Sequence, residues 1–411
     1  LAGIVAAVLL AIHPWTIRWS VDARSYGLTM FFILCAIYAL VRLAESTRWR
    51  WWSLFGFALA YLMWLSVQNV FVAAPLAALA LWLSIRNARN ANLPVIHAVG
   101  QWLMVNILAA CAFLQVMGPN LIQLKQYTEL NPPEKSNYLQ VDAKNMKDAA
   151  SNWLSGLPHD LPVFDGDQAI STFSSEYDSP IVGWVLAGGI LVFSLVGLAL
   201  LMRKDSRTTG VAVAGVFLGG LCLLTVSWAL NLFFYPRFLV YMTLPLAIGC
   251  AVSWTSVGRR DGARPWLPAV GGVIGLIYFT ALALPQIRNL AVHEHEPLPR
   301  ISSAVKSYAE ETNSEPLAAG YGLGSDILAD LLDPSIRFLE NRNELEQMMQ
   351  RARETNRPLL VTYGVQSFNR VILPDGFELL DNLDYFVQIE RFVSNDPRHT
   401  FFLLEYTGKT P

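Results

Sequence analysis

The first two thirds of the chain alternate long apolar runs with short polar interruptions. About 20 consecutive apolar residues suffice for a helix to cross roughly 30 Å of hydrocarbon, so the pattern predicts about nine membrane spans. The polar break "SVQN", Ser66 to Asn69, divides one long block into two helices joined by a tight re-entry. The expected spans lie near residues 1–15 (part of a span), 26–44, 51–67, 69–86, 95–117, 180–202, 210–229, 237–256 and 266–286.

Composition supports a membrane protein. Of 411 residues, 54% are hydrophobic and only 15% are charged, and the mean hydropathy is +0.37. The net charge of -2 and the absence of a long basic tract exclude nucleic acid as a partner, because phosphate-backbone binding relies on clustered Lys and Arg. The four cysteines fall inside apolar runs, so no disulfide or zinc framework is predicted.

Basic residues gather in alternate loops, which predicts the orientation of the spans. Loops rich in Lys and Arg face the cytoplasm. The other side then holds the stretch "RWSVDARSYGL" (18–28), a long loop from about 118 to 179, the loop "NLFFYPR", and everything after about residue 287. The basic residues that set this orientation are Arg42, Arg48, Arg50, Arg86, Arg89, Arg203, Lys204, Arg207, Arg259, Arg260 and Arg264.

The parts outside the membrane are expected to carry their own structure. The loop 118–179 mixes amphipathic segments with Pro, Asp and Ser, which predicts short helices along the outer membrane surface that cap a cavity. After residue 287, "PLAAGYG", "SIRFLE", "PLLVTYG" and "TFFLLEY" are predicted strands, and "ENRNELEQMMQRARETN" is a predicted helix. The fold class is therefore a polytopic α-helical membrane domain over 1–286 and a small extracytoplasmic α/β domain over 287–411.

Charged residues at the outer membrane edge are the candidates for chemistry. Arg24 lies in "DARSY", beside Asp22 and Tyr26, and Arg237 follows Tyr235 at the start of a later span. A guanidinium group at headgroup level can bind a lipid phosphate through two parallel hydrogen bonds. The alternative is that the side chains of these arginines only extend (snorkel) to the membrane–water interface and bind no ligand. Asp22 is equally open to two roles, an acid at the site or a helix cap and partner of Arg24.

Other polar clusters favour structural roles. "DLPVFDGD" (160–167) lacks the spacing of a calcium-binding EF-hand loop and is expected to be a solvated loop. "HEHE" (293–296) could bind a metal, but a solvated linker between the membrane and the C-terminal domain is favoured, so no metal ligands are assigned. "GYGLGSD" (320–326) lacks the lysine of a phosphate-binding loop and is expected to be a turn that opens a helix. His13, before Pro14, is expected to end a span.

Two short motifs carry a family resemblance. "S-V-D-A-R-S-Y-G-L" resembles the S-x-[DE]-A-R-x-Y motif of the GT-C membrane glycosyltransferases, in particular the family 39-like enzymes. Those enzymes include protein mannosyltransferases and the bacterial lipid A aminoarabinose transferase. "FFYPRFLVYMTLPLAIGCA" is similar to a second element of the family, with Arg237, Phe238 and Pro245 in place.

The resemblance implies transfer of a sugar from a polyprenyl-phosphate carrier to a glycan, lipid or protein acceptor at the outer face of a bacterial inner membrane. It assigns Arg24, Tyr26 and Arg237 to the donor phosphate and Asp22 as a secondary acid. It also implies a main catalytic acid in an earlier outer loop, which we expect to precede Leu1, because the first apolar run is too short for a full span. Lys125, Tyr127 and Tyr235 are candidates to complete the pocket, and a divalent metal is left open as cofactor.

Two functions of other classes stay open from the sequence. A transporter or flippase of a lipid-linked or polar substrate would carry inverted repeats and charges at mid-membrane, whereas the charges here lie at one edge. A membrane-anchored scaffold would use the C-terminal domain to bind a partner, and the outer arginines would then be incidental.

Overall fold

The computed structural model describes residues 1–21, 25–46, 48–130, 141, 143–156, 180–203, 206–230, 234, 236–256, 264, 266–292, 294, 296–394 and 399–409. These residues form two compact units. The first comprises the described parts of Leu1–Asp160 and Thr172–Ile287, and the second those of Arg288–Pro411. Each unit has a hydrophobic core of its own and is described separately below.

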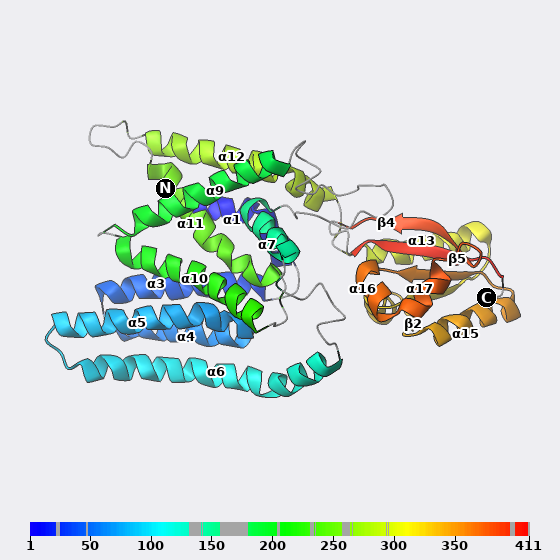
Figure 1. Ribbon diagram of the computed structural model, residues 1–411, viewed down its shortest axis with the longest axis horizontal. Helices are drawn as coiled ribbons and strands as arrows, with labels where there is room; N and C mark the ends of the chain where they lie inside the picture. Colours follow the sequence, from blue (N-terminus) through cyan, green and yellow to red (C-terminus); the bar gives the residue numbers. More distant parts are fainter. Residues whose placement is uncertain are drawn as a thin grey trace. The chain divides into compact units, whose positions relative to one another are not determined.

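The first unit is built from helices (Figure 1), and each apolar segment expected from the sequence is confirmed as a helix. Long apolar composition accounts for their length, because a helix satisfies its backbone polar groups within the segment even where, as in α5, α6 and α12, it contains a proline. The helices are α1 (Ala2–Ile12), α2 (Pro14–Val21), α3 (Tyr26–Glu45), α4 (Trp49–Leu65), α5 (Val70–Asn90), α6 (Val95–Leu130), α7 (Ala143–Ser155), α9 (Pro180–Leu201), α10 (Arg207–Ala229), α11 (Thr243–Ser256) and α12 (Leu267–Val292), with the short 3-10 helices η1 (Val67–Asn69) and η4 (Pro236–Met242).

The length and composition of these helices are those of a membrane protein. Among the described residues, seven helices are long and apolar enough to cross a membrane, and eight if the bent pair α1 and α2 counts as one span. Helix α4, with 17 residues, is the remaining segment of the nine expected. Many large apolar side chains on these helices are exposed, for example Ile96 on α6 and Ile181 on α9. Outward-facing apolar surface of this extent fits contact with lipid rather than water.

Two boundaries differ from the prediction. The apolar run that begins the chain bends by 65° between Ile12 and Pro14, because proline cannot continue the hydrogen-bond ladder of α1. Helix α6 continues to Leu130, well past the expected start of a loop at 118. Its added turns contain Leu, Gln, Lys and Glu, which are good helix formers, and they outweigh the break expected at Gly118 and Pro119.

Close backbone contacts hold α9 against α11. Gly197 lies directly against Gly249, and a side chain on Gly197 would overlap the carbonyl group of Gly249. Ser194 Oγ donates to the Pro245 carbonyl at 3.4 Å, and Cys250 Sγ lies 3.3 Å from the Ile190 carbonyl oxygen. Small residues that let helices approach in this way are typical of helix pairs in membranes.

The second unit is a three-layer α/β structure. Its sheet has the order β2-β1-β3-β5-β4, in which β2, β1 and β3 are parallel while β5 runs antiparallel to β3 and β4. Side chains alternate between two cores: Ala318 packs with α13, whereas Ala319 packs with α15 and α17. The elements are α13 (Leu298–Thr312), β1 (Leu317–Tyr321), α14 (Ser325–Ile327), the π-helix η5 (Leu328–Leu332), β2 (Ile336–Leu339), α15 (Arg342–Thr355), β3 (Leu359–Tyr363), α16 (Gln366–Ile372), α17 (Pro374–Leu380), β4 (Phe386–Phe392) and β5 (Phe401–Tyr406).

All four predicted strands and the predicted helix are confirmed in this unit. "GYGLGSD" is a turn followed by α14, with positive φ at Gly322 and Gly324, and Asn369 closes it by accepting from the Leu323 N–H at 2.9 Å. Strand β4 was not predicted. Its residues Val387 to Glu390 are exposed, and Gln388, Glu390 and Arg391 interrupt its apolar residues, so it lacks the continuous apolar run that marks a buried strand.

Candidate functional site

The short helix η4 brings the Arg237 segment into contact with α2, α3 and α7. Its residues Leu239 to Met242 are buried, which fixes the segment between these helices. Thr243, directly after η4, donates to the Val240 carbonyl at 2.7 Å and receives a 3.4 Å hydrogen bond from Thr16 of α2. The segment that carries Arg237 is therefore joined to the first turn of α2 rather than left as an exposed loop.

Trp19 of α2 is the centre of the site. Its indole is 6% exposed. The ring of Tyr26, at the start of α3, meets it edge-on with 5.5 Å between centroids. The Arg237 guanidinium carbon lies 5.4 Å from the centre of the same indole. Residues from the two motifs singled out in the sequence, far apart along the chain, thus meet on one tryptophan.

A second arginine belongs to this cluster and was missed from the sequence. Arg18 lies 4.9 Å from the Trp19 ring centre and is 7% exposed. A snorkelling arginine would hold its guanidinium in water, whereas Arg18 is enclosed by protein. Two guanidinium groups at one indole gain cation–π attraction and concentrate positive charge at one place. Its place in the sequence could have identified Arg18, because it is the first residue of the stretch "RWSVDARSYGL" that also contains Arg24.

Helix α7 holds η4 and α2 in place from the segment expected to form surface helices. Trp153 Nε1 donates to the Met242 carbonyl at 2.9 Å, and the Trp153 carbonyl lies 3.0 Å from His13 Nε2. The Trp15 N–H donates to His13 Nδ1 at 3.2 Å, so His13 Nε2 carries the proton and donates to Trp153. His13 is fully buried and joins α7 to the bend between α1 and α2, which is a structural role.

The start of α3, where Tyr26 lies, is fixed by the polar break between α4 and α5. Ser25 Oγ donates to the Leu65 carbonyl at 3.3 Å. Buried Asn69 donates to the Leu62 carbonyl at 2.8 Å and to Thr29 Oγ1 at 3.4 Å. The predicted re-entry at "SVQN" is confirmed as η1, and its Asn69 side chain bonds a carbonyl in the last turn of α4.

The structure describes some of the predicted site residues and not others. Tyr26 and Arg237 are described and share Trp19. Asp22, Arg24 and Tyr235 lie outside the described residues. Lys125 and Tyr127 lie on the last turns of α6 instead of in a loop, which corrects the expected boundary at residue 118; only their backbone is described. Within the described residues, no three or more His, Cys, Asp or Glu side chains gather as a metal site would require.

Comparison with known proteins adds no identification. No family model matches this chain, and no curated protein matches it. What can be said of function therefore rests on the sequence motifs and on the cluster around Trp19.

Proposed function

We propose that this protein is a membrane glycosyltransferase of the GT-C type, which moves a sugar from a polyprenyl-phosphate carrier to an acceptor on the outer face of the membrane. The observation that supports it is the meeting of Tyr26 and Arg237 on Trp19. The two segments that resemble the family's motifs contribute to one cluster, as residues of a common site must.

In this proposal the arginines bind the donor phosphate. Arg237 and Arg18 would donate hydrogen bonds to its oxygens, and the indole of Trp19 would hold both guanidinium planes in orientation. During transfer the bond between the sugar and the phosphate oxygen breaks, and negative charge grows on the leaving lipid phosphate. Fixed cations aimed at that charge lower the barrier in a site poor in water.

The acceptor side needs a carboxylate. The acceptor hydroxyl attacks the anomeric carbon, and its proton passes to a carboxylate base as the new glycosidic bond forms. Asp22 is the candidate within this chain, because it lies four residues after Arg18 along the same stretch. Tyr26 is proposed to shape the pocket wall next to the phosphate.

The test is transfer activity of the reconstituted protein with a panel of polyprenyl-phosphate hexoses and pentoses. Arg237→Ala and Arg24→Ala should each lower kcat by about 10²–10³, the usual cost of losing one group that stabilises the transition-state charge. Arg203→Ala is the matched control, since Arg203 is exposed after the end of α9. Unchanged transfer in both variants would refute the phosphate assignment.

The same reconstituted protein can distinguish transport of a lipid-linked sugar from glycosyl transfer. A transporter or flippase would move the labelled polyprenyl-phosphate sugar between leaflets without forming a glycosylated product. Leaflet exchange that is lost in Arg237→Ala, with no transfer by the wild type to any acceptor offered, would favour transport over the proposed reaction.

A further inference from the structure

The second unit carries an exposed aliphatic segment between β1 and β2. Leu323, Ile327, Leu331 and Leu332 are 49%, 39%, 77% and 47% exposed. The inner side of the same segment is also apolar, since Leu328 is fully buried. Two acids interrupt the aliphatic residues of this segment, the half-buried Asp326 and the exposed Asp330. Single exposed leucines need no explanation, but several within ten residues indicate a contact surface.

The chain itself brings lipid close to this unit. Helix α12 ends at Val292 and α13 begins at Leu298, so the five residues 293–297 form the connection. Five residues reach at most about 17 Å. Residues Leu267–Arg288 of α12 are a candidate membrane span, so the first turn of α13 stays within that reach of the end of a helix that is long and apolar enough to lie in lipid.

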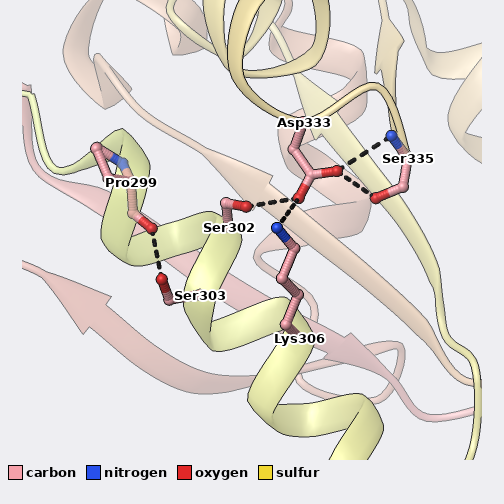
Figure 2. A network of polar contacts seen from close by, with 6 residues as sticks. All are labelled: Pro299, Ser302, Ser303, Lys306, Asp333 and Ser335. Atoms are coloured by element: carbon pink, nitrogen blue, oxygen red, sulfur yellow. Dashed lines mark hydrogen bonds and ion pairs between the residues drawn. The ribbon is translucent and has the colours of Figure 1, made fainter.

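A buried carboxylate, that of Asp333, fixes the aliphatic segment to α13 (Figure 2). Asp333, directly after η5, accepts a 2.5 Å hydrogen bond from Ser302 Oγ and lies 3.6 Å from Lys306 Nζ, both on α13. Its other oxygen accepts from Ser335 Oγ at 2.5 Å. The aliphatic segment therefore lies along α13, and its buried Leu328 shares a core cluster with Leu298 and Ile301 at the end of α13 that the connection enters.

The direction of α13 across the sheet also shows on which side of the sheet this helix begins. Arg300, in its first turn, lies 5.7 Å from the Phe392 ring at the end of β4. Tyr308, in its second half, donates to Glu405 near the end of β5 at 2.6 Å. Strand β4 runs parallel to β1, so the two strands end on the same side of the sheet. The connection enters α13 on that side, and Leu323, which follows β1, lies there too.

We propose that Leu323, Ile327 and Leu331 insert into the interfacial layer of the bilayer beside the connection, so that the second unit is held on the lipid surface at two points. The occupant of this aliphatic surface is lipid, because the covalent connection holds the surface near a bilayer whatever else binds. This proposal does not depend on glycosyl transfer.

The experiment uses the full-length protein in phosphatidylcholine vesicles, with its four cysteines replaced by alanine. A polarity-sensitive fluorophore is attached at Leu331→Cys and, as matched control, at Leu383→Cys. Leu383 is 82% exposed between α17 and β4, at the opposite edge of the sheet, a strand length of roughly 15 Å away. Quenching by nitroxide-labelled phosphatidylcholine is compared with quenching by iodide in the water phase.

We expect blue-shifted emission, quenching by nitroxide lipid and protection from iodide at position 331, and the reverse at position 383. Quenching of both probes by iodide alone would overturn the proposal. Protection of the 331 probe from both quenchers would also overturn it, because protein would then cover the segment. If Leu331→Cys does not fold, Ile327→Cys gives the same comparison.

Discussion

Replacement of Asp333 by asparagine should loosen the region around η5 without changing its shape. Asp333 is 6% exposed and accepts hydrogen bonds from Ser302 Oγ, Ser335 Oγ and the Ser335 N–H. Asparagine keeps the size and one acceptor oxygen, but it turns charge-assisted hydrogen bonds into neutral ones and removes the attraction to Lys306.

The expected cost follows from these contacts. A hydrogen bond to a charged group contributes about 1.5–3 kcal/mol and a neutral one about 0.5–1.5 kcal/mol, so each converted bond loses about 1 kcal/mol. Lys306 is 68% exposed, and its ion pair adds little because water screens it. With two or three bonds converted, the local opening free energy should fall by about 2–3 kcal/mol, which corresponds to roughly 30- to 150-fold faster amide exchange.

Hydrogen exchange of the full-length protein, read at η5 and the first half of α13, measures this change. The matched control is Asp381→Asn, which breaks an exposed ion pair with Arg370 at 2.5 and 2.8 Å. That pair should contribute less than about 1 kcal/mol. If the amides of η5 and the first half of α13 exchange no faster in Asp333→Asn than in Asp381→Asn, the reasoning is refuted.

Two further predictions concern acidity and one glycine. Burial raises the pKa of Asp333, but hydrogen bonds from Ser302 and Ser335, together with Lys306, outweigh it and hold the pKa below its ordinary 3.8. The stability from Asp333 is therefore complete above about pH 4 and is lost as pH falls through the lowered pKa, so the protection factors of the η5 amides, which are corrected for the intrinsic pH dependence of exchange, should fall in acid in the wild type and not in Asp333→Asn. Gly156 follows α7 with φ of +79°, and a Cβ there would lie 2.5 Å from the Pro14 ring. Gly156→Ala should lower the melting temperature of the detergent-solubilised protein, whereas Gly100→Ala, with nothing within 4 Å, should leave it unchanged or raise it slightly; equal melting temperatures would contradict the close contact.

The sequence predicted the helices and the second unit where a single local pattern decides the structure. Length and apolar content placed the spans, and short, mainly apolar runs placed the strands β1, β2, β3 and β5. The extension of α6 was missed because a Gly-Pro pair signals a break, although the helix formers after it decide otherwise. Strand β4 was missed because its pairing with β5 holds it, not its own composition.

The candidate site was predictable in part, for a similar reason. Tyr26 and Arg237 were identified by motif, but their common partner Trp19 is a property of packing, and a tryptophan near a membrane edge normally indicates only an interfacial belt. Arg18 was missed because its burial depends on contacts made after the helices assemble. The motifs thus identified Tyr26 and Arg237, whereas the role of Trp19 between them is visible only in the tertiary structure.

The most direct test of the central claim is binding of polyprenyl phosphate, without a sugar, to the reconstituted protein. Loss of one charge-assisted contact to phosphate should weaken binding by about 1.5 kcal/mol or more, that is, at least about tenfold, in Arg237→Ala. Arg203→Ala should bind as the wild type does. Equal affinity of Arg237→Ala and Arg203→Ala for polyprenyl phosphate would contradict the assignment of the Trp19 cluster to the donor phosphate.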